Sequence, residues 1–130
     1  MKYLLDTHMV LWFAENSSKL SDNAKAIILD ESNEKYVSMA SCWEISIKLS
    51  LNKLTLDGGT REFFHIIIEN GLSLIPIEEE YLSVVEVLPF HHRDPFDRLL
   101  IATAISEKLV LLTDDHQLLE YVGAEFRIES

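Results

Sequence analysis

Six acidic residues stand at points of the chain where carboxylates could act together. Three of them directly follow short apolar runs, and the others stand at the start of, or within, helical stretches with an apolar side. Hard carboxylate oxygens with no cysteine ligand suit Mg²⁺ or Mn²⁺ better than zinc. A divalent ion held in this way activates water and neutralises charge on a reacting phosphodiester. The candidate acids are Asp6, Glu44, Asp94, Asp97, Asp114 and Asp115.

Several of these acids have a simpler structural explanation. Asp6, Asp114 and Asp115 each stand where a helix could begin, so each could be a helix cap. Asp94 precedes Pro95, and proline is favoured at the first helical position, which makes Asp94 a natural N-cap. From its position alone we therefore expect Asp94 to have a structural role.

Asp97 and Glu44 fit the metal site better than they fit a structural role. Asp97 could interact with the helix dipole, and Glu44 could pair with Lys48 one turn later. At about 100° per residue, however, Asp97 points along the apolar stripe of its own helix, and Glu44 lies at the margin of another apolar face. Carboxylates turned toward a core are costly unless something compensates their charge. A bound cation would do so and would also relieve the repulsion between neighbouring acids.

The elements that must position these acids follow from the alternation of short apolar runs with helical stretches. Buried runs of this kind predict a mostly parallel sheet covered on both faces, hence a three-layer α/β/α domain. Such sheets bind ligands at the carboxyl ends of their strands. The expected strands are Lys2–Asp6, Lys35–Ser38, Leu72–Ile75, Leu109–Thr113 and, at an edge, Phe126–Ile128. The expected helices are Thr7–Phe13, Ser21–Asp30, Met39–Ser50, Thr60–Asn70, Glu78–Leu88 and Pro95–Lys108, with a short helix ending at Tyr121.

Length and composition limit the class of protein. The 130 residues suit one domain covering 1–130, and 48% of them are hydrophobic, which suffices for a core. The lone cysteine, Cys42, cannot form an internal disulfide, and we expect it to be a packed apolar side chain. We find no signal-peptide pattern and no apolar run as long as a membrane span. These features predict a cytoplasmic protein.

The net charge, taken alone, argues against a nucleic-acid substrate. The chain has 22 acidic and 11 basic residues, for a formal net charge of −11. Nucleic-acid binders are usually basic because phosphate contacts dominate their affinity. A site that gathers cations would resolve the conflict locally, and a basic protein partner would fit the overall charge.

Four motifs together resemble the PIN-domain family, and within it the VapC-type toxins of type II toxin–antitoxin pairs. They stand in the family's order and span essentially the whole chain, and the third is the most specific. The motifs are Tyr3-Leu-Leu-Asp6-Thr-His, Ser41-Cys-Trp-Glu44-Ile-Ser-Ile-Lys48, His91-His-Arg-Asp94-Pro-Phe-Asp97-Arg-Leu-Leu-Ile-Ala-Thr-Ala104 and Leu111-Leu-Thr113-Asp-Asp115.

The resemblance implies a metal-dependent endoribonuclease that leaves a 5′-phosphate and a 3′-hydroxyl. By the same resemblance, the four family acids are Asp6, Glu44, Asp97 and Asp115, with Asp114 the less favoured choice for the last. Asp94 matches an additional acid of this subgroup, which supports the site or occasionally binds the ion. Thr7 and Thr113 match polar residues that orient the site. The family also implies a homodimer and an antitoxin that blocks the site with a basic segment. The apolar face of Cys42, Ile45 and Leu49 could serve either such a dimer or the core.

Other classes of protein explain the sequence less well. A phospho-accepting receiver domain needs a pair of acids after its first strand and a late lysine, whereas Asp6 is alone and Asp114 stands where that lysine would be. A catalytically inactive acidic protein that binds a basic regulator remains open if all the acids are caps and surface charges. His91 and His92 could be zinc ligands, but they are adjacent in a polar loop, and we favour them less than the carboxylates.

Overall fold

The fold is built around five parallel strands. The computed structural model describes residues 1–121 and 125–128, and the sheet order is β3-β2-β1-β4-β5. The strands are β1 (Lys2–Leu5), β2 (Glu34–Ser38), β3 (Ser73–Ile75), β4 (Val110–Thr113) and β5 (Glu125–Ile128). Every pairing is parallel, including that of the edge strand β5 with β4. The predicted strands are therefore confirmed to within a residue or two at their ends.

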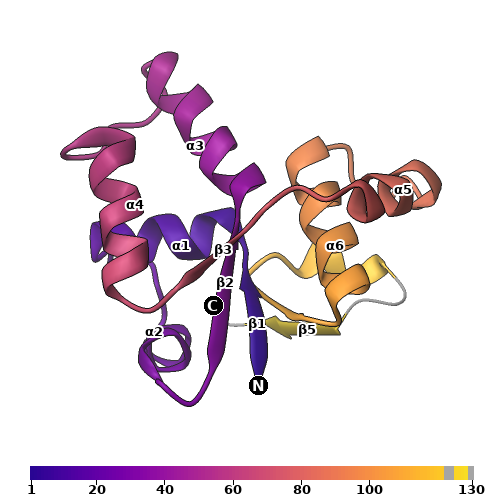
Figure 1. The fold of residues 1–130 in the computed structure, drawn as a ribbon, viewed down its shortest axis with the longest axis horizontal. Coiled ribbons are helices and arrows are strands. Elements are labelled where there is room, and N and C mark those ends of the chain that lie inside the picture. Colours follow the sequence, from indigo (N-terminus) through magenta and orange to yellow (C-terminus); the bar gives the residue numbers. More distant parts are fainter. Residues whose placement is uncertain (122–124, 129–130) are drawn as a thin grey trace.

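Six α-helices connect and cover these strands. They are α1 (Thr7–Glu15), α2 (Asp22–Leu29), α3 (Met39–Ser50), α4 (Gly59–Glu69), α5 (Glu79–Val87) and α6 (Pro95–Glu107), and the 3₁₀ helix η1 (His116–Glu120) follows β4. Figure 1 shows α1, α2 and α4 on one side of the sheet and α5 and α6 on the other. This is the predicted three-layer α/β/α arrangement. No helix in the described part of the chain is long and apolar enough to cross a membrane.

Alternation along the central strands divides the core between the two faces. Leu5 and Leu112 point into the cluster beneath α1, α2, α3 and α4. Leu4 and Leu111 point the other way, into the cluster that includes side chains of α6. All four side chains are fully buried. A continuous apolar run in the sequence thus serves two separate layers, because successive side chains of a strand point to opposite faces.

The buried face of α3 answers one open question from the sequence. Cys42 and Ile45 are 2% and 1% exposed and belong to the core. Leu49 is partly buried and packs against the same cluster. Burial raises the pKa of the Cys42 thiol to about 11, which keeps it in the unreactive thiol form. This face of α3 therefore packs inside the domain, as the packing role predicted for Cys42 requires.

Candidate functional site: an acidic cluster at the carboxyl edge of the sheet

Strand register places Asp6 beside Thr113. Leu5 of β1 pairs with Leu112 of β4, so the next residues of the two strands emerge together at the carboxyl edge. The Thr113 hydroxyl donates to Asp6 Oδ2 at 2.7 Å, and Asp6 N–H donates to the Leu112 carbonyl at 2.9 Å. Asp6 is only 3% exposed, and burial raises the pKa of its carboxyl group, while the bond from Thr113 opposes the rise. Asp6 is thus held by one oxygen in a place that disfavours its charge.

Thr113 also connects the two acids that end neighbouring strands. Its Oγ1 accepts the N–H of Asp115 at 3.0 Å while its hydroxyl proton is directed at Asp6. Asp115 caps η1 by accepting the N–H of Gln117 at 2.9 Å. Asp114 lies near enough to Asp6 to raise the pKa of that carboxyl group. Both acids after β4 therefore border the cluster, and Asp115 is also the cap that the structural alternative predicted.

Helix α6 brings Asp97 into the same cluster. Asp94 is its N-cap, with Oδ1 accepting the N–H groups of Phe96 at 2.8 Å and Asp97 at 3.2 Å. The side chain of Asp97 is 20% exposed. Burial raises the pKa of the Asp97 carboxyl group to about 8, and repulsion from other acids adds to the rise. The acids that contribute are, in decreasing order of effect, Asp6, Asp94, Glu44 and Asp115.

Helix α3 supplies Glu44. The helix begins at the end of β2, where the Ser38 side chain accepts the N–H of Ala40 at 3.0 Å. Glu44 lies in its second turn and is 7% exposed, and Lys48 Nζ is 3.1 Å from its Oε2. The pair with Lys48 that the sequence allowed as an alternative is thus present. It uses one oxygen of Glu44 and leaves the other inside the protein.

A hydroxyl pair fixes α3 against α1. Thr7 Oγ1 and Ser41 Oγ are 2.8 Å apart and buried, so the residue after Asp6 is joined to the helix that carries Glu44. Figure 1 shows α1 and α3 beginning at the same end of the sheet. The amino-terminal half of α6 lies toward that end as well. Thr7 was expected to orient the site. Ser41 was not singled out, although it stands in the same motif as Glu44, one helical turn before it.

Two buried oxygens in the cluster lack a partner. Asp6 Oδ1 and Glu44 Oε1 are both inaccessible to solvent and accept no hydrogen bond from the residues that the structure describes. A buried carboxylate oxygen left in this state is costly. Hard oxygens from several acids are the donors that Mg²⁺ and Mn²⁺ prefer, and a divalent ion in the cluster would offset the repulsion around Asp97. The donor set therefore fits a divalent cation.

His92, which the sequence favoured less than the carboxylates as a ligand, also lies in the cluster. His92 Nε2 is 3.5 Å from Asp97 Oδ2 and 3.8 Å from Asp115 Oδ2, and one atom from each of these three residues could surround a metal ion. His91 instead lies 3.6 Å from Glu120 and packs against the ring of Tyr121. The two adjacent histidines therefore do not converge as a zinc pair. Periodicity could not have identified His92, because its loop has none.

Arg98 holds the loop that carries His92. Its buried guanidinium donates to the carbonyl groups at the end of α5 and just beyond, and to Tyr121 Oη at 3.3 Å. Tyr121 Oη in turn accepts the N–H of His92 at 2.9 Å. Arg98 also lies 4.0 Å from the ring centroid of Phe90. The three carbonyls are those of Val85, Leu88 and Pro89, at 3.2, 3.0 and 2.8 Å. A charged residue inside the apolar run of α6 was the sequence feature that could have revealed this role.

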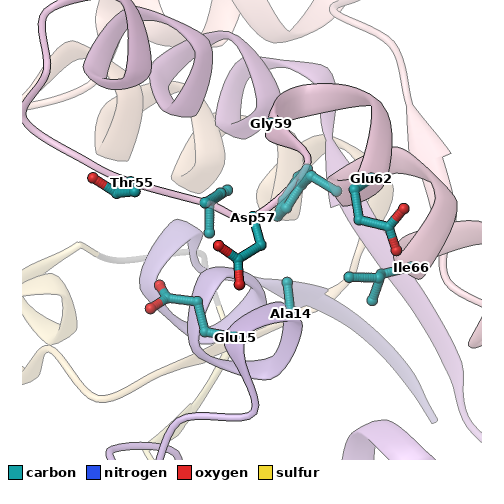
Figure 2. A pocket seen from close by; sticks show the side chains of 9 residues that line it. Ala14, Glu15, Thr55, Asp57, Gly59, Glu62 and Ile66 are labelled. Carbon is teal, nitrogen blue, oxygen red and sulfur yellow. The ribbon is translucent and has the colours of Figure 1, made fainter.

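A separate pocket of about 370 Å³ lies between the end of α1 and the start of α4. Figure 2 shows the carboxylates of Glu15 and Asp57 on one side of it, and Glu62 also lines it. None of the acids of the carboxyl-edge cluster borders this pocket. Asp6 precedes the first turn of α1, whereas Glu15 is its last residue. The pocket is thus a second acidic feature, distinct from the candidate metal site.

Comparisons with solved structures agree with this architecture. A chain of VapBC2 from Rickettsia felis, solved bound to a DNA fragment from the promoter, matches with a TM-score of 0.78 and 15% identity over 100% of both chains. DNA-bound VapBC from Salmonella typhimurium matches with a TM-score of 0.70 and 14% identity over 98% of both chains. VapBC-5 from Mycobacterium tuberculosis matches with a TM-score of 0.64 and 18% identity, over 98% of this chain and 96% of that one. At these identities the likeness concerns the fold.

Family membership rests on the sequence. No curated protein sequence matches the chain significantly. The profile of the PIN domain, by contrast, matches residues 3–124, which is nearly the entire chain and includes every acid of the cluster. The chain therefore belongs to the PIN domain family.

Proposed function

We propose that the protein is a metal-dependent endoribonuclease whose acidic cluster hydrolyses RNA phosphodiester bonds. The observation that carries the proposal is the pair of buried, unpartnered oxygens on Asp6 and Glu44 beside Asp97. Three segments far apart in the sequence hold these carboxylates at one edge of the sheet, where parallel α/β domains bind ligands. Such an arrangement is unfavourable for the protein alone and becomes favourable with a divalent cation.

In this proposal Asp6, Asp97, Glu44 and Asp115 hold Mg²⁺ or Mn²⁺, and Asp94 has a supporting part. When bound, the ion supplies a more acidic water and neutralises charge that develops on the phosphate. The chain's own residues orient the carboxylates. Thr113 fixes one oxygen of Asp6, and Lys48 fixes one oxygen of Glu44, and the other oxygen of each is buried without a hydrogen-bond partner among the described residues.

Glu44 has a second proposed part, which is to orient the attacking water. Its Oε1 accepts no hydrogen bond from the described residues, and the contact of Oε2 with Lys48 limits rotation of the carboxylate. Glu44 comes from α3, whereas the other acids come from strand ends and α6. A carboxylate on a separate element can therefore act on the water without giving up its place in the cluster.

We further propose that the protein is the toxin of a toxin–antitoxin pair. The support is the fold shared with chains of VapBC complexes, together with the family resemblance of the four motifs. The net charge of −11 favours association with a basic segment of an antitoxin, because complementary charge accelerates encounter. A homodimer is part of the same proposal, with the exposed Trp43 of α3 and Val87 of α5 as apolar surface for it.

Purified protein incubated with RNA, with and without Mg²⁺, tests the enzyme proposal. We expect cleavage only with the ion, and a loss of about 10²-fold or more in Asp6→Asn and Asp97→Asn, because each removes a charged ligand. Asp22→Asn is a matched control, since Asp22 is exposed on α2 and away from the cluster. Full activity of both site variants would show that the site assignment is wrong.

The alternative is a catalytically inactive acidic protein that binds a basic regulator. It would give no RNA cleavage under any ion condition, but would bind a basic peptide with an affinity that falls steeply with salt. The unpartnered oxygens of Asp6 and Glu44 favour the enzyme over this alternative. Carboxylates that only cap helices or lie on the surface are not expected to leave buried oxygens without partners.

A further inference from the structure

The loop before α6 places an imidazole inside the acidic cluster in a defined orientation. His92 is anchored at its backbone, where its N–H donates to Tyr121 Oη at 2.9 Å, and Tyr121 is itself held by Arg98. The side chain of His92 is 18% exposed, so it is largely enclosed. The position of its ring is therefore set by the fold and not by solvent.

A hydrogen bond to the ring determines which nitrogen carries the proton. The N–H of Asp94 donates to His92 Nδ1 at 3.1 Å. An imidazole nitrogen accepts only through a free lone pair, so Nδ1 is unprotonated and the ring proton lies on Nε2. Asp94 cannot turn this N–H elsewhere without cost, because its side chain caps α6.

This tautomer conflicts with a metal-binding role for His92. A metal ion needs the lone pair of Nε2, and the ring proton would then move to Nδ1, directly opposite the N–H of Asp94. The three-residue set of His92, Asp97 and Asp115 is compact enough for an ion, but in this set His92 presents an N–H and not a lone pair. The distances of 3.5 and 3.8 Å from Nε2 to the two carboxylates are also too long for settled hydrogen bonds.

We propose that His92 donates a hydrogen bond from Nε2–H to a non-bridging oxygen of the RNA phosphate and does not bind the ion. The proposal rests on the nuclease function above. A cluster of acids repels a phosphodiester, and donors aimed into the cluster offset that repulsion as charge grows on the phosphate. Among the described residues, Lys48 is the one further cationic or imidazole donor within 4 Å of an acid of the cluster. Its ammonium group already contacts Glu44. His92 Nε2–H has no such partner at hydrogen-bonding distance.

Two amide substitutions separate the roles of the two ring nitrogens. In His92→Asn the side-chain oxygen takes the place of Nδ1 and can still accept from Asp94, but no donor reaches the position of Nε2. In His92→Gln the longer side chain places an amide N–H near that position. We expect His92→Asn to lower kcat by about 10²-fold, the usual effect of losing one donor to a developing charge. We expect His92→Gln to stay within about tenfold of the wild type.

Metal binding distinguishes a donor from a ligand without measuring activity. Calorimetric titration of the intact protein with Mn²⁺ should give the same affinity for the wild type and both variants, whereas loss of a true ligand would weaken it by at least the 10–100-fold typical of outer-shell changes. Weaker Mn²⁺ binding in His92→Asn, or full activity of that variant, would overturn the proposal. If the wild type fails to cut RNA at all, the nuclease function fails, and the next measurement still tests His92.

Nitrogen-15 NMR of the imidazole reads the tautomer directly. For the neutral ring we expect the shifts of a protonated Nε2 and an unprotonated Nδ1. Inorganic phosphate added with Mg²⁺ should shift the Nε2 resonance of the wild type. A proton on Nδ1, or no response to phosphate, would show that His92 is not the donor.

Discussion

Asp97 shows at the scale of one residue how a site can work against the stability of its own fold. Its carboxyl group is mostly enclosed and is surrounded by other acids, which together raise its pKa to about 8. Without a cation the protein must either keep this group neutral or accept the repulsion. Such a residue is favourable for binding an ion and unfavourable for the metal-free fold, which is typical of functional sites.

This predicts that metal-free protein loses stability as the pH rises. Because the folded pKa is raised above the ordinary value of 3.8, the stabilisation is fully present below about pH 4. It is lost as the pH rises toward about 8. Asp97→Asn removes the ionisation, so it should raise the free energy of unfolding at pH 8 in EDTA by about 2 kcal/mol and change little at pH 4. Urea unfolding at the two pH values measures this, with Asp22→Asn as control. Equal destabilisation by Asp97→Asn at both would contradict it.

At the scale of elements, the start of helix α6 is stabilised by the residue just before it and by residues of its first turn. Asp94 caps it, Pro95 begins it, and Arg98 ties it to the end of α5. The same residues set the position of Asp97 and of the loop that carries His92. Helix stability and site geometry are therefore coupled in this segment.

Substitutions of Asp94 separate its cap from its charge. Asp94→Asn keeps an oxygen that can accept the N–H groups of Phe96 and Asp97, so we expect near wild-type stability and a lower pKa for Asp97, since one repelling carboxylate is gone. Asp94→Ala also removes the cap and should cost about 1 kcal/mol. Thermal unfolding compares the two variants. If they are equally stable, the cap contributes nothing.

Removal of Arg98 should loosen the connection between α5 and α6. Arg98→Ala leaves three carbonyl groups and Tyr121 Oη without their donor in a buried place, and we expect a loss of about 3 kcal/mol in the free energy of unfolding. Arg61→Ala on the exposed face of α4 is the matched control and should change it little. Hydrogen exchange at the N–H of His92 should accelerate in Arg98→Ala. Unchanged exchange there would mean that the loop does not depend on Arg98.

At the scale of the whole molecule, the acidic cluster and the net charge of −11 favour cations over anions. The cluster lies where β1, β4, α3 and α6 meet, so an ion bound there would connect elements from both layers of helices. Binding to the folded state alone stabilises a protein by mass action. The metal ion should therefore be visible in the stability of the entire fold.

We predict that Mg²⁺ or Mn²⁺ raises the melting temperature of the wild type. At an ion concentration of about 100 times its Kd the gain is about 2.7 kcal/mol. Asp6→Asn and Asp97→Asn should lose most of this gain, whereas Asp57→Asn, in the separate pocket beside α1, should keep it. Differential scanning calorimetry with a Ca²⁺ and an EDTA arm measures the effect. An equal gain in all variants would place the ion elsewhere.

The sequence determined the layers of this fold and the identity of its acids, because local patterns carry that information. Continuous apolar runs predicted buried parallel strands, and the capping residues Ser21 and Asp94 marked where two helices begin. The acid types and their places at strand ends were enough to indicate a divalent-metal site. The charge balance could be judged from composition alone.

Only the tertiary structure decided which atoms face one another. The bond from Thr113 to Asp6 joins residues 107 positions apart and follows from strand register, which no local pattern contains. The same holds for the hydroxyl pair of Thr7 and Ser41 and for the orientation of His92 in its loop. Burial, and with it the raised pKa of Asp97, depends on packing between distant segments. The proposed chemistry could therefore be inferred from residue types, whereas the geometry of the site required the fold.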